Sequence, residues 1–317
     1  MSDLTKVVIA LGGNALQSKD SDATAESQLE TVKKTCKHIA EIVRQKYEIA
    51  IVHGNGPQVG RILLTSETAA EITPVMPFDV CGAMSQGYIG YHIQQSLKKA
   101  NAEIGRADIP IVTLVTQVLV DKDDPGFSNP TKPIGKYYTK EEADELVKTK
   151  GYTMKEDAGR GWRRVVASPK PIEILEIDTV RRLWDSTIVI VCGGGGIPVI
   201  RTDHNEVQGV PAVIDKDFAA EKLAEETDAN ILLILTEVEK VCLNFGKPDQ
   251  KELTNVSIAE AEEYIAQGHF APGSMLPKVE ACLTFVKKYP DRKAIITSLD
   301  KAVEALNGET GTVFLGQ

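Results

Sequence analysis

Cysteine is scarce in this chain and gives no sign of cross-linking or metal binding. Among 317 residues there are five cysteines, odd in number and far apart, and no two form a Cys-x-x-Cys pair. This pattern argues against a disulfide framework and a zinc site, and we expect no metal site among the side chains. Free cysteine is typical of buried core positions. The five are Cys36, Cys81, Cys192, Cys242 and Cys282.

Long apolar runs and an excess of positive charge are also missing. No stretch approaches the roughly 20 apolar residues that a membrane helix needs, and no signal-peptide pattern follows Met1. The net charge is −9, so the molecule as a whole repels nucleic acid and anionic membranes. We therefore expect a cytoplasmic protein that binds neither, and whose anionic ligands are attracted by a local cluster of lysines.

Glycine, in contrast, is concentrated at a few places. Three glycine-rich segments each follow a short apolar run, and they are Gly12-Gly13-Asn14, His53-Gly54-Asn55-Gly56 and Gly193-Gly194-Gly195-Gly196. Glycine at the end of a strand lets backbone N–H groups approach an anion without a Cβ in the way. Tight turns also need glycine, but three such loops together with Lys216-Asp217 favour a polyphosphate site.

Strand-like and helical patterns alternate along the chain. Apolar runs such as 6–11, 49–53, 109–119, 188–192 and 230–235 are continuous rather than alternating. This is typical of parallel strands buried on both faces of a sheet. We predict a three-layer α/β/α sandwich with a mainly parallel central sheet, formed by one domain over residues 1–317.

Residues 121–168 interrupt this alternation. The segment is dense in turn residues, and no core-length strand is evident before Arg164. It is too long for a simple connection, and its aromatic residues are unusual for a disordered linker. We predict a small ordered subdomain that projects over the edge of the sheet.

Six segments together resemble the amino acid kinase family, and within it the carbamate kinases. They are residues 10–15, 53–60, 163–171, 192–198, 214–217 and 271–278, and the resemblance covers essentially the whole chain. It implies a reversible, magnesium-dependent reaction in which ATP and carbamate give ADP and carbamoyl phosphate. It also implies a homodimer, with residues 1–185 mainly on the acceptor side and residues 186–317 mainly on the nucleotide side. An ATP-forming last step of arginine catabolism is the expected role.

The chemistry agrees with this resemblance. Phosphoryl transfer needs alignment and positive charge more than covalent help, and carbamate is already a nucleophilic anion that needs no general base. The resemblance assigns Lys216 and Lys278 to the transferred phosphoryl group, with Asp217 holding them. The expected substrate-binding and phosphate-binding residues are Gly12, Gly13, Asn14, Gly54, Asn55, Gly193 and Gly194.

Lys132 is the expected replacement for a missing cation. Many amino acid kinases have lysine two residues before the first Gly-Gly, where this chain has Ala10. The resemblance places Lys132, in what we interpret as a proline-stiffened turn, over the substrate as a fourth catalytic residue. A surface lysine on a mobile loop is the alternative.

The nucleotide is expected beyond the third glycine loop. The resemblance assigns it Thr236, Val238, Gly273, Ser274 and Met275, in addition to Lys216 and Lys278. Cys242 stands where relatives often have tyrosine. We interpret it as a reactive thiol at the rim of the adenine pocket whose thiolate is favoured by Lys240; the alternative is a buried, inert cysteine.

Three other functions remain open on the sequence alone. One is a kinase of the same fold that acts on another small carboxylate, a phosphonate or a nucleoside monophosphate. A dinucleotide-dependent oxidoreductase is the second, but the Gly193 loop lacks the G-x-G-x-x-G spacing. The third is a silent nucleotide sensor, which the lysines argue against.

Overall fold

In the part of the chain that the structure describes, eight strands form the central sheet. The computed structural model describes residues 4–18, 22–157 and 159–316. The strand order is β15-β17-β16-β12-β1-β2-β9-β3, and among the described pairs only β16 and β17 are antiparallel. The strands are β1 (Lys6–Leu11), β2 (Glu48–His53), β3 (Ile111–Thr113), β9 (Ile188–Ile190), β12 (Ile231–Thr236), β15 (Asn255–Ser257), β16 (Lys293–Ser298) and β17 (Thr312–Leu315).

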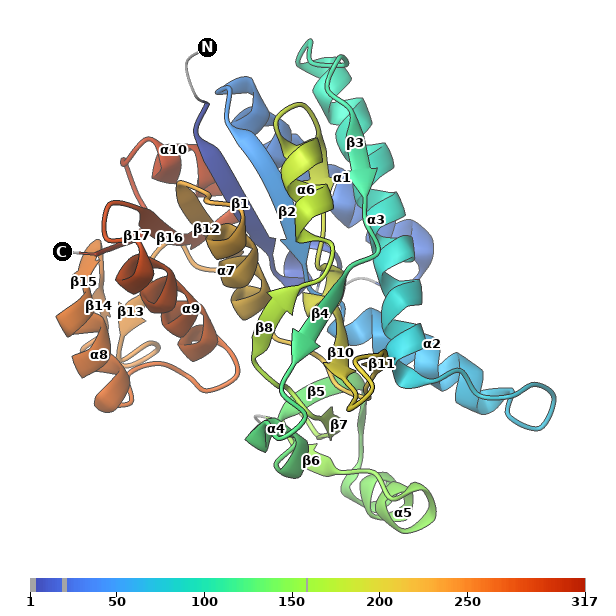
Figure 1. Cartoon of the computed structure of the whole chain (residues 1–317). Coiled ribbons are helices and arrows are strands. Elements are labelled where there is room, and N and C mark those ends of the chain that lie inside the picture. Colours follow the sequence, from blue (N-terminus) through green and yellow to red (C-terminus); the bar gives the residue numbers. More distant parts are fainter. Residues whose placement is uncertain (1–3, 19–21, 158, 317) are drawn as a thin grey trace.

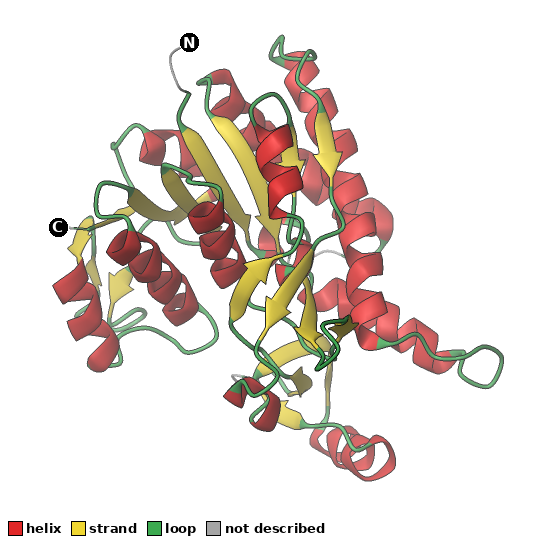
Figure 2. Cartoon of the chain, in the orientation of Figure 1, coloured by secondary structure: helices red, strands yellow, loops and turns green. Residues whose placement is uncertain are grey.

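Helices cover both faces of this sheet (Figures 1 and 2). One face carries α6 (Ile177–Trp184), α7 (Lys216–Glu226) and α9 (Met275–Lys288), with α8 (Ile258–Ala266) at the side. The other carries α1 (Ala25–Arg44), α3 (Phe78–Glu103) and α10 (Ala302–Leu306). The predicted three-layer α/β/α architecture with a mainly parallel sheet is therefore confirmed.

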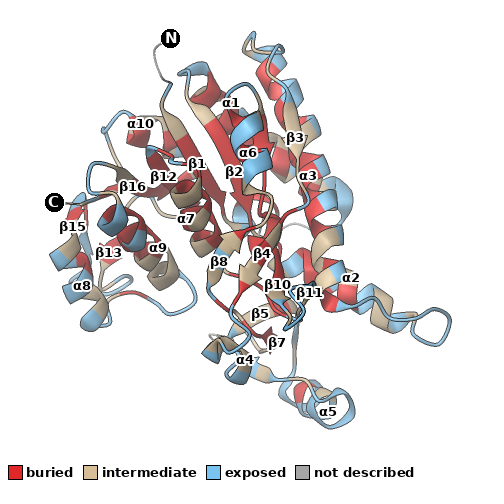
Figure 3. Ribbon diagram, in the orientation of Figure 1, coloured by how far each residue is buried: buried red, intermediate tan, exposed pale blue. Residues whose placement is uncertain are grey.

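The continuous apolar runs follow directly from this layering. In β1, Val8 and Ala10 belong to the core on the α7 and α9 side, and Val7, Ile9 and Leu11 belong to the core on the α1 and α3 side. Successive side chains of a strand point to opposite faces, so a sheet covered twice needs apolar residues at every position. Figure 3 shows the resulting buried centre.

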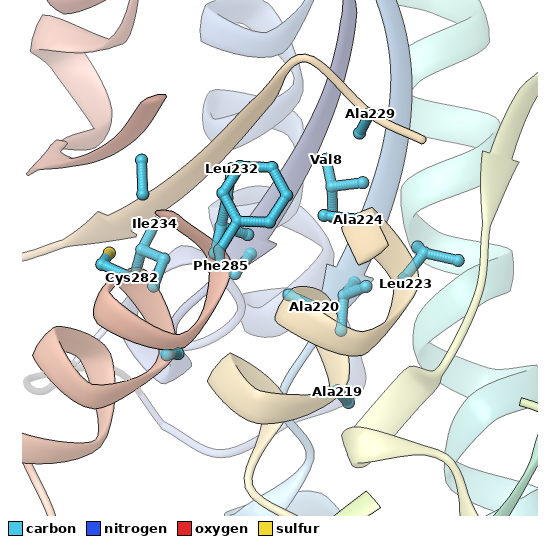
Figure 4. Close-up of a cluster of buried hydrophobic side chains, with 14 of the residues drawn as sticks. Val8, Ala219, Ala220, Leu223, Ala224, Ala229, Leu232, Ile234, Cys282 and Phe285 are labelled. Atoms are coloured by element: carbon cyan, nitrogen blue, oxygen red, sulfur yellow. The ribbon is translucent and has the colours of Figure 1, made fainter. Parts of the chain in front are cut away.

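Small side chains allow α7 to lie close to the sheet. Ala219, Ala220 and Ala224 are fully buried with Leu223 in the same core cluster as Val8 of β1 and Leu232 of β12, and Ala224 lies beside Val8 (Figure 4). Because alanine adds little bulk, the helix backbone approaches the strands. The first turn of α7 is thereby held beside the carboxyl ends of β1 and β12.

The sequence-based strand over 109–119 is wrong. The chain forms β3 in the central sheet and then β4 (Gln117–Val120) in a second sheet with β8 (Pro171–Ile174), β10 (Ile197–Arg201) and β11 (Val207–Gly209). The buried amide of Gln86 explains the break, because it accepts from Thr116 N at 2.8 Å and donates to Thr116 O at 3.0 Å. The Gln86 side chain thus occupies Thr116 N, while Thr116 O also accepts from Ile197 N of β10 at 2.9 Å.

Residues 121–168 contain α4 (Pro125–Ser128), α5 (Lys140–Lys150) and a three-stranded sheet. The strands are β5 (Lys132–Tyr138), β6 (Met154–Glu156) and β7 (Trp162–Val166), in the order β5-β7-β6. They lie beyond the carboxyl end of the central sheet (Figure 1). The expected turn at Lys132 is wrong, because Lys132 begins β5. The sequence did not indicate this strand because it contains Pro133 and Gly135. Proline is tolerated there because β5 lies at the edge of its sheet.

The remaining elements are one further helix and several short segments. Gly56–Thr68 forms α2, whose Gly60 meets Gly135 of β5 so closely that a Cβ on Gly60 would lie 2.2 Å from Gly135 N. The others are β13 (Cys242–Leu243), β14 (Lys251–Glu252) and the 3-10 turns η1 (Gly13–Ala15), η2 (Gly193–Gly195) and η3 (Leu299–Lys301). Among the described residues no helix is long and apolar enough to cross a membrane.

Candidate active site

The glycine loops meet at one edge of the central sheet. Gly12 follows β1, Gly54 follows β2, and Gly193 lies just after β9, and these three strands are parallel. Parallel strands present their carboxyl ends at the same edge, where ligands of open α/β sheets bind. A Cβ on Gly12 would lie 3.3 Å from Leu235 O, so the β1 and β12 ends are close neighbours.

Asp217 is the centre of a buried group of charges. Its side chain is 2% exposed, and it forms ion pairs with Lys216 through Oδ1 and with Lys278 through Oδ2, the latter at 3.0 Å. Lys278 Nζ also donates to Ser274 O at 3.1 Å. The aspartate thus holds a lysine from α7 and a lysine from α9 side by side.

The two lysines respond differently to this environment. Burial lowers the pKa of Lys216, and the second ammonium of Lys278 adds to this effect, although Asp217 opposes it. Burial by itself also lowers the pKa of Lys278, but there the Asp217 carboxylate outweighs burial and the net pKa is raised. Asp217 therefore keeps two cations together at a place where neither would be buried alone.

Asp215 connects a third lysine to the same helix end. Its Oδ1 accepts from Asp217 N at 2.9 Å and caps α7, while its Oδ2 pairs with Lys132 Nζ at 2.6 Å. Burial would raise the pKa of Asp215, but Lys132 and Lys216 hold it well below its usual value. Asp215 is not among the site residues expected from the sequence. Aspartate is a common N-cap residue, and Asp215 directly precedes α7.

A cavity of about 560 Å³ opens next to these charges. Ligand pockets commonly have volumes of about 300–1,000 Å³. Of the residues expected at the site, those that line it are Gly12, Gly13, Asn14, Lys216, Thr236, Val238, Cys242, Ser274, Met275 and Lys278. Arg160, which the sequence analysis did not assign to the site, lines it too. The structure thus brings the two lysines and the expected nucleotide segments together around one space.

Gly193 and Gly194 are buried and tightly packed. A Cβ on Gly194 would lie 2.1 Å from Asn55 Nδ2, and one on Gly193 would lie 2.6 Å from His53 Nε2. Gly194 also has a φ of 69°, a left-handed conformation that favours glycine. These glycines therefore let the loop after β9 press against the loop after β2. Neither lines the large cavity.

The loop after β2 is held by its own polar side chains. Asn55 Nδ2 donates to Ser85 Oγ at 2.8 Å, and its buried Oδ1 accepts no hydrogen bond from the residues that the structure describes. Complete burial lowers the pKa of His53 to about 4, so its ring is neutral near pH 7. A Cβ on Gly54 would lie 3.4 Å from Lys216 Cδ, which places this loop directly beside the lysine.

Cys242 lines the cavity but is not activated by Lys240. The residue is buried, and its Sγ lies 3.6 Å from Lys240 O. Burial raises the pKa of the thiol, and the Glu252 carboxylate raises it further. Lys240 instead pairs with Glu252, with Nζ and Oε2 3.7 Å apart. The expectation that Lys240 favours the thiolate is therefore wrong.

The described residues contain no cluster of three or more His, Cys, Asp or Glu side chains arranged to hold a metal ion. Asp217, the carboxylate nearest the cavity lysines, already has two ammonium partners. A divalent cation at this site would therefore be held mainly by oxygen atoms that arrive with a ligand, as is common for Mg²⁺ with phosphates.

Comparison with known proteins identifies related chains over the full length. The profile of the amino acid kinase family matches residues 5–298. A carbamate kinase of Clostridium perfringens is 58% identical over 311 residues, which are 97% of this chain and 98% of that protein. Among solved structures, carbamate kinase from Giardia lamblia bound to AMP-PNP is 43% identical, covers 99% of both chains and has a TM-score of 0.91.

A second structure of the Giardia lamblia enzyme is thiocarbamoylated by disulfiram on the cysteine numbered Cys242 in that protein. It is 42% identical to this chain, covers 99% of both chains and has a TM-score of 0.88.

Proposed function

This chain belongs to the amino acid kinase family, within its carbamate kinase branch, and from that premise we propose that it transfers a phosphoryl group between ATP and carbamate. The products are ADP and carbamoyl phosphate, and the reaction is reversible. One observation carries the assignment to this site. Lys216 and Lys278 are fixed by one buried carboxylate at the mouth of a cavity whose other walls are the expected nucleotide segments.

The lysines supply the main catalytic effect. In the forward direction a carbamate oxygen forms a bond to the γ-phosphorus, while the bond from that phosphorus to the bridging oxygen of ADP breaks. Negative charge on the phosphoryl oxygens is shared by Lys216 and Lys278, and no proton has to be removed from the nucleophile. Because Asp217 orients both ammonium groups before the reaction, little reorganisation is required.

The acceptor binds on the opposite side of Lys216 from the nucleotide. The loop after β2 touches the Lys216 stem at Gly54, and Asn55 offers a buried amide oxygen there. Lys132 reaches the same helix end through Asp215. We propose that Lys132 exchanges part of this ion pair for the phosphate of carbamoyl phosphate, while Gly193 and Gly194 keep the adjoining loop close enough to enclose it.

The nucleotide occupies the large cavity. Thr236 and Val238 follow β12, and Ser274 and Met275 begin α9, so the base and ribose lie between these two segments. Gly273 has a φ of 72° and turns the chain into α9. Gly12, Gly13 and Asn14 face the same space from the end of β1. Phosphate oxygens of the nucleotide would hold Mg²⁺, which would neutralise part of the phosphate charge.

The ATP-forming direction is the chemically favoured one, because carbamoyl phosphate is a high-energy acyl phosphate. We propose that the enzyme acts in the cytoplasm as the last step of arginine catabolism. The molecule's net charge of −9 agrees with a role that involves no nucleic acid.

Formation of ATP from ADP and carbamoyl phosphate, measured by a coupled assay, tests the proposed function. Acetyl phosphate should be a poorer donor than carbamoyl phosphate, whereas a kinase that acts on another small carboxylate would show the reverse preference. A chelator should abolish the reaction, and excess Mg²⁺ should restore it. Absence of ATP formation with carbamoyl phosphate and Mg²⁺ would exclude the assignment.

Lys216→Met and Lys278→Met should each lower kcat by roughly 10²–10³-fold, since each removes one preorganised positive contact. Methionine retains the buried stem, so the melting temperature should change little. Lys287→Met is the matched control, because Lys287 lies on α9 but is 45% exposed and pairs with Glu262. Steady-state rates within threefold of wild type for either site variant would remove that lysine from the mechanism.

Lys132→Ala should raise KM for carbamoyl phosphate and lower kcat, while ADP binding by calorimetry stays within about threefold of wild type. The reason is that Lys132 is paired at the α7 end and does not line the nucleotide cavity. Lys136→Ala, which removes an exposed lysine of the same strand, is the control. A parallel loss of ADP affinity would place Lys132 in the nucleotide site or in a structural role.

Thiol reagents should inactivate the enzyme through Cys242, and bound ADP should protect it. The cysteine lines the nucleotide cavity, and a cysteine of the Giardia lamblia enzyme is modified by disulfiram. Because the pKa of this thiol is raised, inactivation should be slow near neutrality and accelerate as pH rises. Inactivation of Cys242→Ala at the wild-type rate would instead point to another thiol.

We further propose a homodimer that uses the exposed side of α3. Val80, Met84 and Tyr91 lie along one side of this helix and are 38%, 48% and 61% exposed. A Cβ on Gly87, which lies on the same side of the helix, would meet nothing within 4 Å, so a partner helix can approach there closely. An apolar stripe with gaps of this kind suits an isologous contact, and two-fold dimers are the commonest oligomers.

Met84→Glu combined with Tyr91→Glu should therefore convert the dimer to a monomer in sedimentation analysis. Val147→Glu is the matched control, because Val147 is 46% exposed but lies on α5. A wild-type monomer, or a dimer that both variants retain, would reject this surface.

A further inference from the structure

The turn between β6 and β7 brings an arginine of residues 121–168 to the edge of the nucleotide cavity. Arg160 lies in this turn and lines the cavity together with Asn14, Lys216 and Lys278. Among the described residues that line this cavity, it is the one that comes from residues 121–168. Residues 121–168, which pack beside the expected acceptor side of the site, thus also reach the nucleotide cavity on the other side of Lys216.

Asp157 holds the Arg160 guanidinium in place. Arg160 Nη2 donates to Asp157 Oδ1 at 2.8 Å, and the other carboxylate oxygen accepts from Tyr137 at 3.2 Å and from Arg163 at 3.4 Å. The Arg160 guanidinium also lies 5.4 Å from the centre of the Tyr137 ring. Asp157 is thus a fixed anchor, and it orients the arginine from one side.

The side chain of Arg160 is more exposed to solvent than that of its neighbour Arg163. The Arg163 side chain is 13% exposed and donates to Gly135 O at 3.1 Å, so it belongs to the packing of the small sheet. The Arg160 side chain is 59% exposed and faces the cavity edge. A guanidinium has five N–H donors in a rigid fork that matches phosphate oxygens, and one ion pair to Asp157 does not use them all.

The positive charge beside the cavity is smaller than the negative charge of the phosphates of a nucleotide, so an additional cation would favour nucleotide binding. Lys216 and Lys278 share the single negative charge of Asp217, so together these three groups contribute a net charge of about one. The phosphates of ADP or ATP bring more negative charge than this. We propose that Arg160 binds the phosphates of the nucleotide, as a further substrate-binding residue supplied by residues 121–168. This inference rests on the proposed use of ATP and ADP.

The register of the small sheet separates this contact from that of Lys132. Lys132 pairs with Val166 at one end of β5, and Tyr138 pairs with Trp162, two residues after Arg160, at the other end. Seven strand residues separate the two ends by about 20 Å at roughly 3.3 Å per residue. One rigid sheet therefore presents one cation toward the α7 end and a second toward the nucleotide, and the two can be tested independently.

Binding of ADP and of adenosine to Arg160→Ala tests the inference without measuring activity. Calorimetry should show a roughly 10- to 100-fold weaker affinity for ADP, as expected for loss of a charge-assisted contact. Adenosine, measured by competition, should bind within twofold of wild type because it has no phosphate. Arg160→Lys should recover part of the ADP affinity, since it keeps the charge without the fork.

Lys155→Ala is the matched control, because Lys155 is an exposed cation of the same small sheet whose Nζ donates to Asn129 at 3.2 Å. It should bind ADP as wild type does. The inference is overturned if Arg160→Ala binds ADP as tightly as this control, or if adenosine affinity falls in parallel, which indicates a structural role. Failure of wild type to bind ADP would instead reject the proposed function.

Discussion

The structure of the site depends on one buried carboxylate. Asp217 is 2% exposed and has ion pairs with Lys216 and Lys278, which come from two helices. Loss of one lysine leaves the carboxylate paired with the other, whereas loss of both would leave a buried unpaired charge, which typically costs about 3–5 kcal/mol. The first turns of α7 and α9 are therefore tied together, and each helix is fixed to the sheet by its apolar face. The ion pairs with Asp217 and the apolar packing of α7 and α9 thus agree in where they place each of the two lysines.

Close backbone packing is the second constraint, and glycine satisfies it. The loop after β9 meets Asn55 and His53 so closely that a Cβ on Gly193 or Gly194 would clash, and Gly60 meets Gly135 in the same way. These contacts connect three parts of the molecule: the central sheet, the helix after β2 and the small sheet of residues 121–168. Glycine in this fold therefore serves packing between segments as well as exposure of backbone N–H groups.

Much of the fold could be read from the sequence because its signal is local. Continuous apolar runs predicted strands covered on both faces, and the spacing of Ser257 and Glu260 is that of the capping box with which α8 begins. The break between β3 and β4 could not be predicted, because it is caused by Gln86, 30 residues before Thr116. Lys132 was placed in a turn for a similar reason: its strand is defined by pairing with Val166, and proline and glycine hid that pairing.

By itself, the sequence determined the layers, the family and the residues that meet at the sheet edge, since motifs at the ends of parallel strands converge there. Only the tertiary structure decided how those residues are partnered. It showed that Asp215 holds Lys132, that Glu252 rather than Cys242 pairs with Lys240, and that Arg160 reaches the nucleotide cavity. Each of these facts depends on contacts between residues that are distant in sequence or on burial. The burial of a polar or charged side chain sets its pKa and its accessibility, and this burial depends on which distant segments cover the side chain.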